Sequence, residues 1–188
     1  MLDIVLIALM IMPFAVFAAF YATYNKIIAL DQRCEQAYHD IDIQLRYRHE
    51  LIPNIVEAVR GAMNHESDML RAVVEARMQA LGSMTQDQQL QSETRLGQAV
   101  GQLINMVEGY PDLKASEHFT GLRAELSDCE HKIAAARRFH NLATSEYNTV
   151  VSQFPGRKIA PMFRLHIRKF MDMTPERVFF EDTPEVKF

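Results

Sequence analysis

The chain has 188 residues, of which 48% are hydrophobic and 23% charged, and its formal net charge is −4 at pH 7. This length suits one domain with an appendage, and the balance of residues allows a packed core, so the chain need not be disordered. The acidic balance and the lack of a basic block argue against a nucleic-acid-binding protein. Gly and Pro number only 7 each, and this scarcity of helix breakers favours a helical fold.

The first predicted element is an uncharged apolar run over 4–22. As a helix it would be about 28 Å long, close to the thickness of a bilayer's hydrocarbon core. Tyr21 and Tyr24 stand where an interfacial aromatic belt belongs. A cleaved signal peptide is the rival interpretation, but no Lys or Arg precedes the run, and the best cleavage pattern, 16–18, lies inside it. We therefore predict a single-span anchor over 1–24 that contacts the lipid bilayer through 4–22.

The orientation of this anchor follows from the bases around it. None precedes the run, whereas Lys26 and Arg33 follow it closely and Arg46 and Arg48 lie a little further on. The positive-inside rule then predicts the N-terminus outside and the C-terminal body in the cytoplasm. The charges are few, so a body on the opposite, periplasmic side stays open as the alternative.

Apolar residues recur at helical spacing beyond Tyr24, so the anchor helix is expected to continue into the body. Pro53 removes one main-chain hydrogen bond from this helix and predicts a kink over 49–52. A second helix is predicted over 69–80, where apolar residues again follow helical spacing.

Two further helices complete the predicted body. Thr85 and Gln88 have the spacing of a capping box, and the helix that they begin should run to Glu108. The last helix, over 116–153, would be about 57 Å long, so it needs partners of comparable length. The sequence therefore predicts an all-α fold, with an antiparallel bundle of long helices over 25–156 after the transmembrane helix.

The tail over 157–188 has a different composition, with aromatics, bases and prolines mixed. A short basic amphipathic helix is predicted over 162–171. We favour a tail that packs back on the bundle. The alternative is a membrane or partner surface, and its candidate residues are Arg164, Arg168, Lys169 and Phe170.

Catalytic and metal-binding patterns are weak. HExxH does not occur, and the Asp128-x-x-His131 spacing of bundle di-metal sites has no second copy. Cys34 and Cys129 fall on apolar stripes, where Cys behaves as a small hydrophobe. We predict no enzyme activity, no bound metal and no cofactor. A metal-dependent hydrolase is the remote alternative, with the candidate ligands His49, His65, Asp128 and His131.

A charge ladder lies on the long first helix. Asp42, Arg46 and Glu50 are spaced four residues apart and share one face. They are either solvent-facing pairs, which contribute little, or they are covered in part by a neighbouring helix or subunit. The sequence leaves both interpretations open.

Several blocks of the sequence, in this order, resemble the LemA family: AYHDIDIQLRYRHELIPNIVEAVRGAMNHE, INMVEGYPDLKASEHFTGLRAEL and HKIAAARRFHNLATSEYNTVVSQFP. The resemblance covers about Tyr24 to Pro155. Its motif positions are the interaction candidates, namely Asp40, Asp42, Gln44, Arg48, Pro53, Asn54, Glu57, Tyr110, Pro111, Asp112, Tyr147 and Asn148. The chain departs from the family in Tyr38, where Trp is frequent, and in the basic character of its tail.

The resemblance implies a bacterial single-span protein with a helical body and no established catalytic activity, and one branch of the family is associated with magnetosome membrane formation. We therefore expect a non-enzymatic, membrane-anchored scaffold in the cytoplasmic membrane that self-associates as a homo-oligomer and organises membranes or membrane proteins. The alternative is an adaptor for a membrane protease or sensor system, which would bind a membrane-protein partner.

Overall fold

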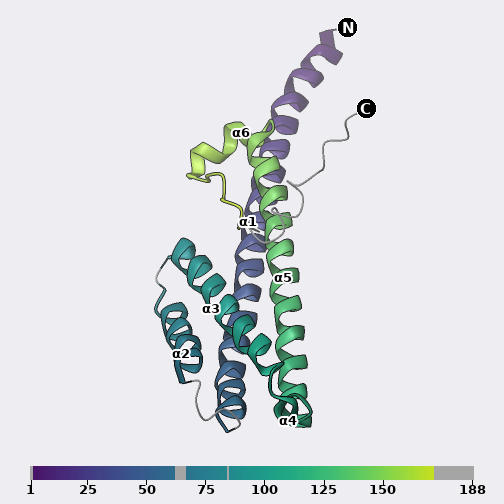
Figure 1. The fold of residues 1–188 in the computed structure, drawn as a ribbon. Coiled ribbons are helices and arrows are strands. Elements are labelled where there is room, and N and C mark those ends of the chain that lie inside the picture. Colours follow the sequence, from purple (N-terminus) through teal and green to yellow (C-terminus); the bar gives the residue numbers. More distant parts are fainter. Residues whose placement is uncertain (1, 62–66, 84, 172–188) are drawn as a thin grey trace, which may run out of the picture. The chain divides into compact units, whose positions relative to one another are not determined.

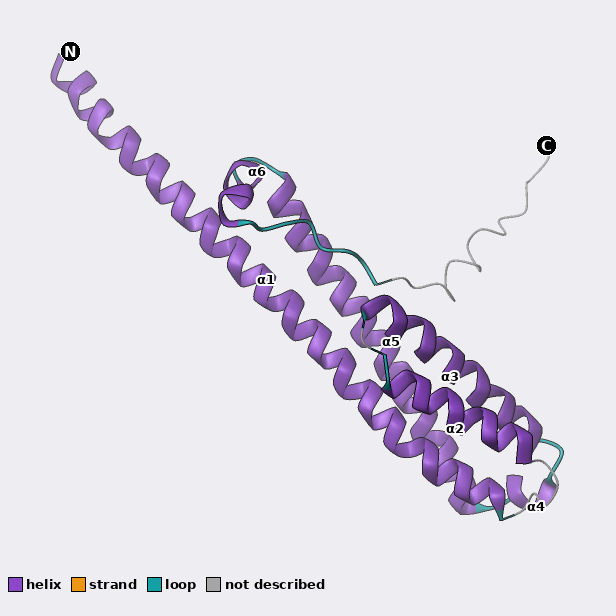
Figure 2. Ribbon diagram, turned by 90° about the vertical axis from the view of Figure 1, so that its left-hand side faces the viewer, coloured by secondary structure: helices purple, strands orange, loops and turns teal. Residues whose placement is uncertain are grey.

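The structure is a computed structural model that describes residues 2–61, 67–83 and 85–171. Within these ranges every regular element is helical (Figure 2). In chain order (Figure 1) the elements are α1 (Leu2–Arg60), α2 (Ser67–Leu81), α3 (Gln86–Val107), α4 (Pro111–Lys114), α5 (Glu117–Ser152), α6 (Gly156–Ile159) and the 3₁₀ helix η1 (Ala160–Phe163). The predicted all-α class, with a long apolar helix at the N-terminus and further long helices after it, is confirmed.

The chain divides into two compact units, which are described separately. The terminal unit takes its described residues from Met1–Ile41 and Ala134–Phe188, and the central unit is Asp42–Ile133. Helices α1 and α5 contribute to both units, because the boundaries fall inside them.

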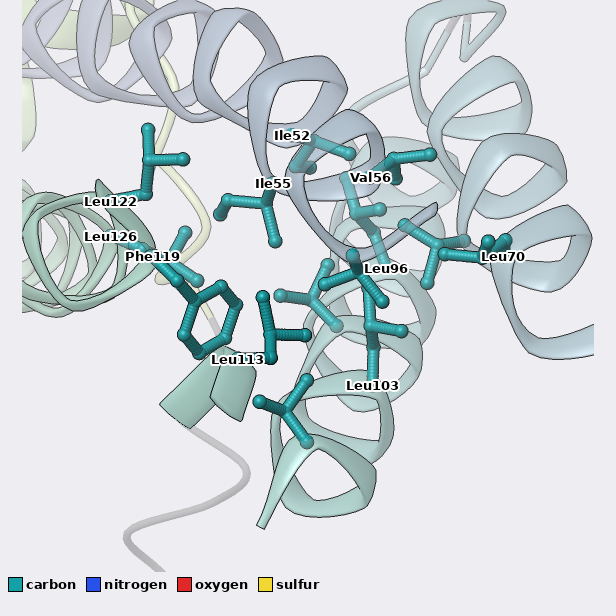
Figure 3. Close-up of a cluster of buried hydrophobic side chains, with 14 of the residues drawn as sticks. Ile52, Ile55, Val56, Leu70, Leu96, Leu103, Leu113, Phe119, Leu122 and Leu126 are labelled. Atoms are coloured by element: carbon teal, nitrogen blue, oxygen red, sulfur yellow. The ribbon is translucent and has the colours of Figure 1, made fainter. Parts of the chain in front are cut away.

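The central unit combines the C-terminal part of α1 with α2, α3, α4 and the first half of α5. The predicted capping box is confirmed: the Thr85 hydroxyl accepts from the Gln88 N–H, and the Gln88 side chain accepts from the Thr85 N–H. The apolar faces of these helices share one core (Figure 3), whose members include Ile52, Ile55, Val56, Leu70, Leu96, Leu103, Leu113, Phe119, Leu122 and Leu126. Burial of each large side chain contributes about 1.5–3 kcal/mol.

In the terminal unit, the first part of α1 and the second half of α5 run antiparallel. Arg33 pairs with Glu146, whereas Tyr38, further along α1, packs on His140, which is earlier in α5. Their core includes Ile27, Cys34, Ala37, Ala143, Tyr147, Val151, Ile159 and Ala160. After α5 the chain turns through α6 and η1 and then runs back along the helices in an extended segment (Figure 2).

The predicted helix over 162–171 is wrong. Helix η1 ends at Phe163, Arg164 takes a left-handed conformation with φ 57°, and residues 165–171 are not helical. The reason lies in hydrogen bonding, because side chains of α5 bind the main-chain groups of Arg168 and Met171 that a helix would use internally. We call residues 165–171 the strap.

Candidate functional site

The central unit contains a buried charge cluster made by Arg48 and His49 of α1, Glu93 of α3 and Glu130 of α5. The Arg48 guanidinium pairs through Nη2 with Glu93 Oε2 and through Nη1, at 2.9 Å, with Glu130 Oε1. The Arg48 and Glu93 side chains are only 4% and 2% exposed, whereas Glu130 reaches the surface. Since a buried charge is costly unless it is paired, this cluster fixes three helices of the central unit against one another.

His49 completes the cluster. Its Nε2 lies 2.8 Å from Glu93 Oε1. Burial, together with the charges of Arg48 and Arg77, lowers the pKa of His49 to about 4, so the ring is neutral near pH 7. A carboxylate can only accept, so we assign the ring proton to Nε2, which donates to Glu93. Nδ1 then carries a lone pair, and this buried atom has no hydrogen-bond partner.

The main chain of His49 has a separate role. Its carbonyl would normally accept from the N–H four residues later, but that residue is Pro53, which has no N–H. Arg77 of α2 donates to this carbonyl through Nε at 2.9 Å. Helix α1 therefore stays helical across Pro53, and the hydrogen bond that the proline removes is replaced by a contact with α2.

The remaining metal-ligand candidates are dispersed. Asp128 and His131 are not brought to the cluster, and Asp128 pairs with Lys132 at the surface. His65 lies outside the described residues. Among the residues that are described, no three His, Cys, Asp or Glu side chains come together in an arrangement that could hold a metal ion. Glu93, the buried carboxylate, already binds Arg48 and His49.

Both cysteines are buried and free. Burial raises the pKa of the Cys34 and Cys129 thiols, so they are held in the protonated form, which is a poor nucleophile. The Cys129 Sγ donates to the Gln44 carbonyl at 3.4 Å. Both cysteines are therefore buried, as their positions on the apolar stripes of the sequence indicate.

The charge ladder of α1 splits into two environments. Asp42 is half-buried and accepts from the Gln89 amide of α3 at 3.1 Å, whereas Arg46 and Glu50 are exposed. Of the other motif positions in the central unit, Gln44 and Tyr110 are half-buried, and the exposed ones are Pro53, Asn54, Glu57, Pro111 and Asp112. Asp40, at the end of the terminal unit's part of α1, is also exposed.

The strap of the terminal unit is bound by two asparagines of α5. Asn148 donates to the Arg168 carbonyl and accepts from its N–H, both at 2.9 Å. Asn141, two turns earlier on α5, makes the same pair of bonds with Met171 at 2.9 and 2.8 Å. Tyr147 adds a bond from its hydroxyl to the His166 carbonyl.

The Arg168 side chain crosses from the strap to α1. It pairs with Asp31 at 2.8 Å and with Glu35 at 2.6 Å, and it lies over the Tyr147 ring. The structure therefore brings Tyr147, Asn148 and Arg168 together, although the sequence grouped Arg168 with a membrane or partner surface. The other members of that surface group, Arg164, Lys169 and Phe170, are exposed.

The N-terminal part of α1 presents apolar side chains outward. Those at Met10, Ile11, Met12, Phe14, Val16 and Phe17 are at least 60% exposed. Among the described residues this helix is long and apolar enough to cross a membrane, and only 6% of its most apolar stretch is buried. These side chains are unlike those of a core helix, which would be covered.

Several partners of these sites were missed by sequence reasoning. Glu93 has a detectable signal, because it lies on the helical stripe of Leu96, Val100 and Leu103 and is the one acid on that buried face. Arg77 and Asn141 have no local signal, since each acts on a main-chain group far away in the sequence.

Comparison with known proteins gives the family. A family model described as "LemA family" matches residues 37–188. Magnetosome protein MamQ 2 of Paramagnetospirillum magneticum is 23% identical over an alignment of 183 residues that covers 81% of this chain and 67% of the relative. Magnetosome protein MamQ of Magnetospirillum gryphiswaldense is 21% identical over an alignment of 158 residues that covers 70% of this chain and 58% of the relative. The resemblance inferred from the sequence blocks is confirmed.

Proposed function

Because the chain belongs to the LemA family, we propose that it is a non-enzymatic, membrane-anchored helical scaffold that self-associates and organises membrane or membrane-protein assemblies. The observation that carries this proposal is α1 itself. One helix, α1, leads from exposed apolar side chains into the packed core of the terminal unit. Such a helix carries the chain from a bilayer directly into a folded helical unit.

The location of the body is part of the proposal. The bases Lys26 and Arg33 directly after the span favour the cytoplasmic side of the bacterial cytoplasmic membrane, with the N-terminus outside. The relatives are named as magnetosome proteins, and this supports a role at a membrane.

A structural role for the buried charge cluster supports the non-enzymatic part. Arg48, His49 and Glu93 bind one another and are almost fully covered, so a substrate would have to displace their mutual bonds. Tightly paired buried groups of this kind fix packing and register.

Self-association needs an exposed surface, and α2 offers one. Val74, Met78 and Leu81 are 39%, 66% and 57% exposed and follow helical spacing along one face. We assign this apolar stripe of α2 as the contact between copies of the chain. Exposed apolar side chains grouped on one helix face are typical of protein–protein contacts.

Two differently tagged copies, expressed together and extracted with native lipid, test this assignment. Capture of one tag should recover the other. The double variant Met78→Glu with Leu81→Glu should lose most of this recovery, whereas Gln79→Glu, a polar and exposed position on the same helix, should keep it. Equal recovery from all three proteins would reject α2 as the contact, and no recovery from the unchanged chain would reject self-association.

A further inference from the structure

The segment 154–164, which we call the surface turn, packs on α1 at the C-terminal end of the predicted membrane span. The Phe163 ring lies 4.4 Å from the Tyr24 ring and 6.5 Å from the Phe20 ring, between centroids. Ile159 of the same turn shares a core with Ile27. Since the span is expected over 4–22, a turn held against Phe20, Tyr24 and Ile27 lies at the level where the helix leaves the hydrocarbon.

The surface turn exposes three apolar side chains, one of which, Phe163, also packs on Tyr24 of the same unit. Phe154 is 85% exposed, Met162 69% and Phe163 45%. An isolated exposed apolar residue needs no explanation, but three in one short turn beside a membrane helix form a group. Aromatic and apolar side chains of this kind enter the interfacial region of a bilayer favourably.

Along the chain, the charges that flank these side chains are of one sign. From Asn148 to Met171 the sequence holds five Lys and Arg residues and no Asp or Glu. Arg157, Lys158 and Arg164 are exposed, and in the described part of the chain none of these three has an ion-pair partner, in contrast to Arg168, which is held by Asp31 and Glu35. Lys26, adjacent to the core residue Ile27, adds a further exposed base.

We propose that the surface turn binds the anionic surface of the bilayer that the span crosses. Phe154 and Met162 enter the interface, and Arg157, Lys158 and Arg164 bind the phosphates of anionic headgroups. This inference rests on the anchoring part of the proposed function. A second attachment beside the span would fix the rotation of the terminal unit about α1, which a single helical anchor leaves free.

The chain contains no Trp, so single-Trp variants of the full chain test the contact. Met162→Trp and Phe154→Trp report whether the surface turn contacts lipid, and Val16→Trp reports whether the span does. Leu142→Trp is the matched control, because Leu142 is an exposed apolar position of the same unit. It lies close to His140, which packs on Tyr38. Tyr38 is roughly four helical turns beyond Tyr24 on α1, so this position is expected to lie away from the bilayer. Each protein is reconstituted in vesicles of phosphatidylcholine with equimolar phosphatidylglycerol, with and without brominated acyl chains.

We expect brominated lipid to quench the Trp fluorescence of the Val16→Trp protein strongly, that of Met162→Trp and Phe154→Trp partly, and that of Leu142→Trp little. Quenching of Val16→Trp with no quenching of either turn variant overturns the inference and leaves the anchor intact. No quenching at any of the three positions overturns both the anchor and the inference. Equal quenching of Leu142→Trp and the turn variants also overturns the inference, because the contact would not be specific to the turn.

A second comparison tests the charge contribution. In vesicles without phosphatidylglycerol, the quenching of Met162→Trp should fall. Adding Arg157→Gln and Lys158→Gln to Met162→Trp should abolish the difference in quenching between the two lipid compositions. Arg33→Gln with Arg138→Gln removes the same charge elsewhere in the terminal unit and should leave the difference in place. If the control pair abolishes it equally, overall charge and not the turn attracts the lipid, and the proposal fails.

Discussion

The Arg77 guanidinium donates to the main-chain carbonyl of His49, which is the carbonyl that Pro53 leaves without its helical donor. A proline inside a helix normally costs about 3 kcal/mol or more. Here the free carbonyl becomes an attachment point for α2. Pro53 is therefore tolerated because another helix supplies the hydrogen bond that it removes.

A double-mutant cycle between Pro53 and Arg77 tests this relationship. Arg77→Ala alone should lower the free energy of unfolding by roughly 1.5 kcal/mol, because a charge-assisted hydrogen bond is lost. In a Pro53→Ala background the helix supplies its own N–H, so the same change should cost less than half as much. Urea unfolding of the detergent-solubilised chain measures both, with Arg71→Ala on an exposed position of α2 as the control. Equal costs in the two backgrounds would show that Arg77 and Pro53 are independent.

Because His49 is neutral in the folded protein, the free energy of unfolding should depend on pH. Burial and the charges of Arg48 and Arg77 lower its pKa to about 4, below the ordinary value near 6.5 in an unfolded chain. Between these values the unfolded state binds a proton that the folded state does not, so stability falls as the pH decreases. From pH 7 to pH 5 the loss assigned to His49 is about 2 kcal/mol.

The variant His49→Gln isolates this contribution, because its amide can still donate to Glu93 but does not titrate. The difference in unfolding free energy between pH 7 and pH 5 should be smaller in His49→Gln than in the unchanged chain. His131→Gln, at an exposed position, should behave like the unchanged chain. An undiminished pH dependence in His49→Gln would mean that His49 is not the group responsible.

The two asparagines of α5 should hold the strap independently of each other. In Asn148→Ala the Arg168 amide loses its acceptor, so its hydrogen exchange should become about tenfold faster, as expected for a bond worth roughly 1.4 kcal/mol. The Met171 amide, bound by Asn141, should change less. Thr149→Ala, which removes only a bond within α5, serves as the control. Unchanged exchange at Arg168 would contradict the pairing.

Gly156 is required by the turn after α5. A Cβ at this position would collide with the Val150 carbonyl oxygen, so Gly156→Ala must displace main chain and should cost about 2 kcal/mol. A Cβ at Gly121, in α5, would lie in open space, and Gly121→Ala should stabilise the chain by about 0.5–1 kcal/mol. The unfolding temperatures of the two variants should therefore shift in opposite directions. A higher unfolding temperature for Gly156→Ala would contradict the tight turn.

Local patterns were sufficient to predict the long helices. The Thr85 and Gln88 pair marked the start of α3, and apolar spacing marked the long last helix, observed as Glu117–Ser152. Both signals act within one or two turns of the chain. They carry no information on which distant groups a helix will bind.

The predictions that failed did so because the decisive contacts join residues that are far apart in the sequence. Arg168 looked like a surface base because its partners, Asp31 and Glu35, lie more than 130 residues earlier in the chain. Residues 162–171 had helical spacing, but the α5 asparagines bind the main chain of the strap in an extended form. Glu93 could have been recognised as buried from its stripe, yet its pairing with Arg48 follows only from the packing of α1 on α3.

An anchored scaffold of the kind proposed here binds copies of itself in the membrane. The most direct test is the mass of the particle extracted from the membrane in native lipid, measured by mass photometry, with the proteins in it identified by their peptides. We predict a uniform particle that holds several copies of this chain and no other protein at a fixed ratio. A single copy alone would contradict self-association, and a second protein at a fixed ratio would favour the adaptor alternative instead.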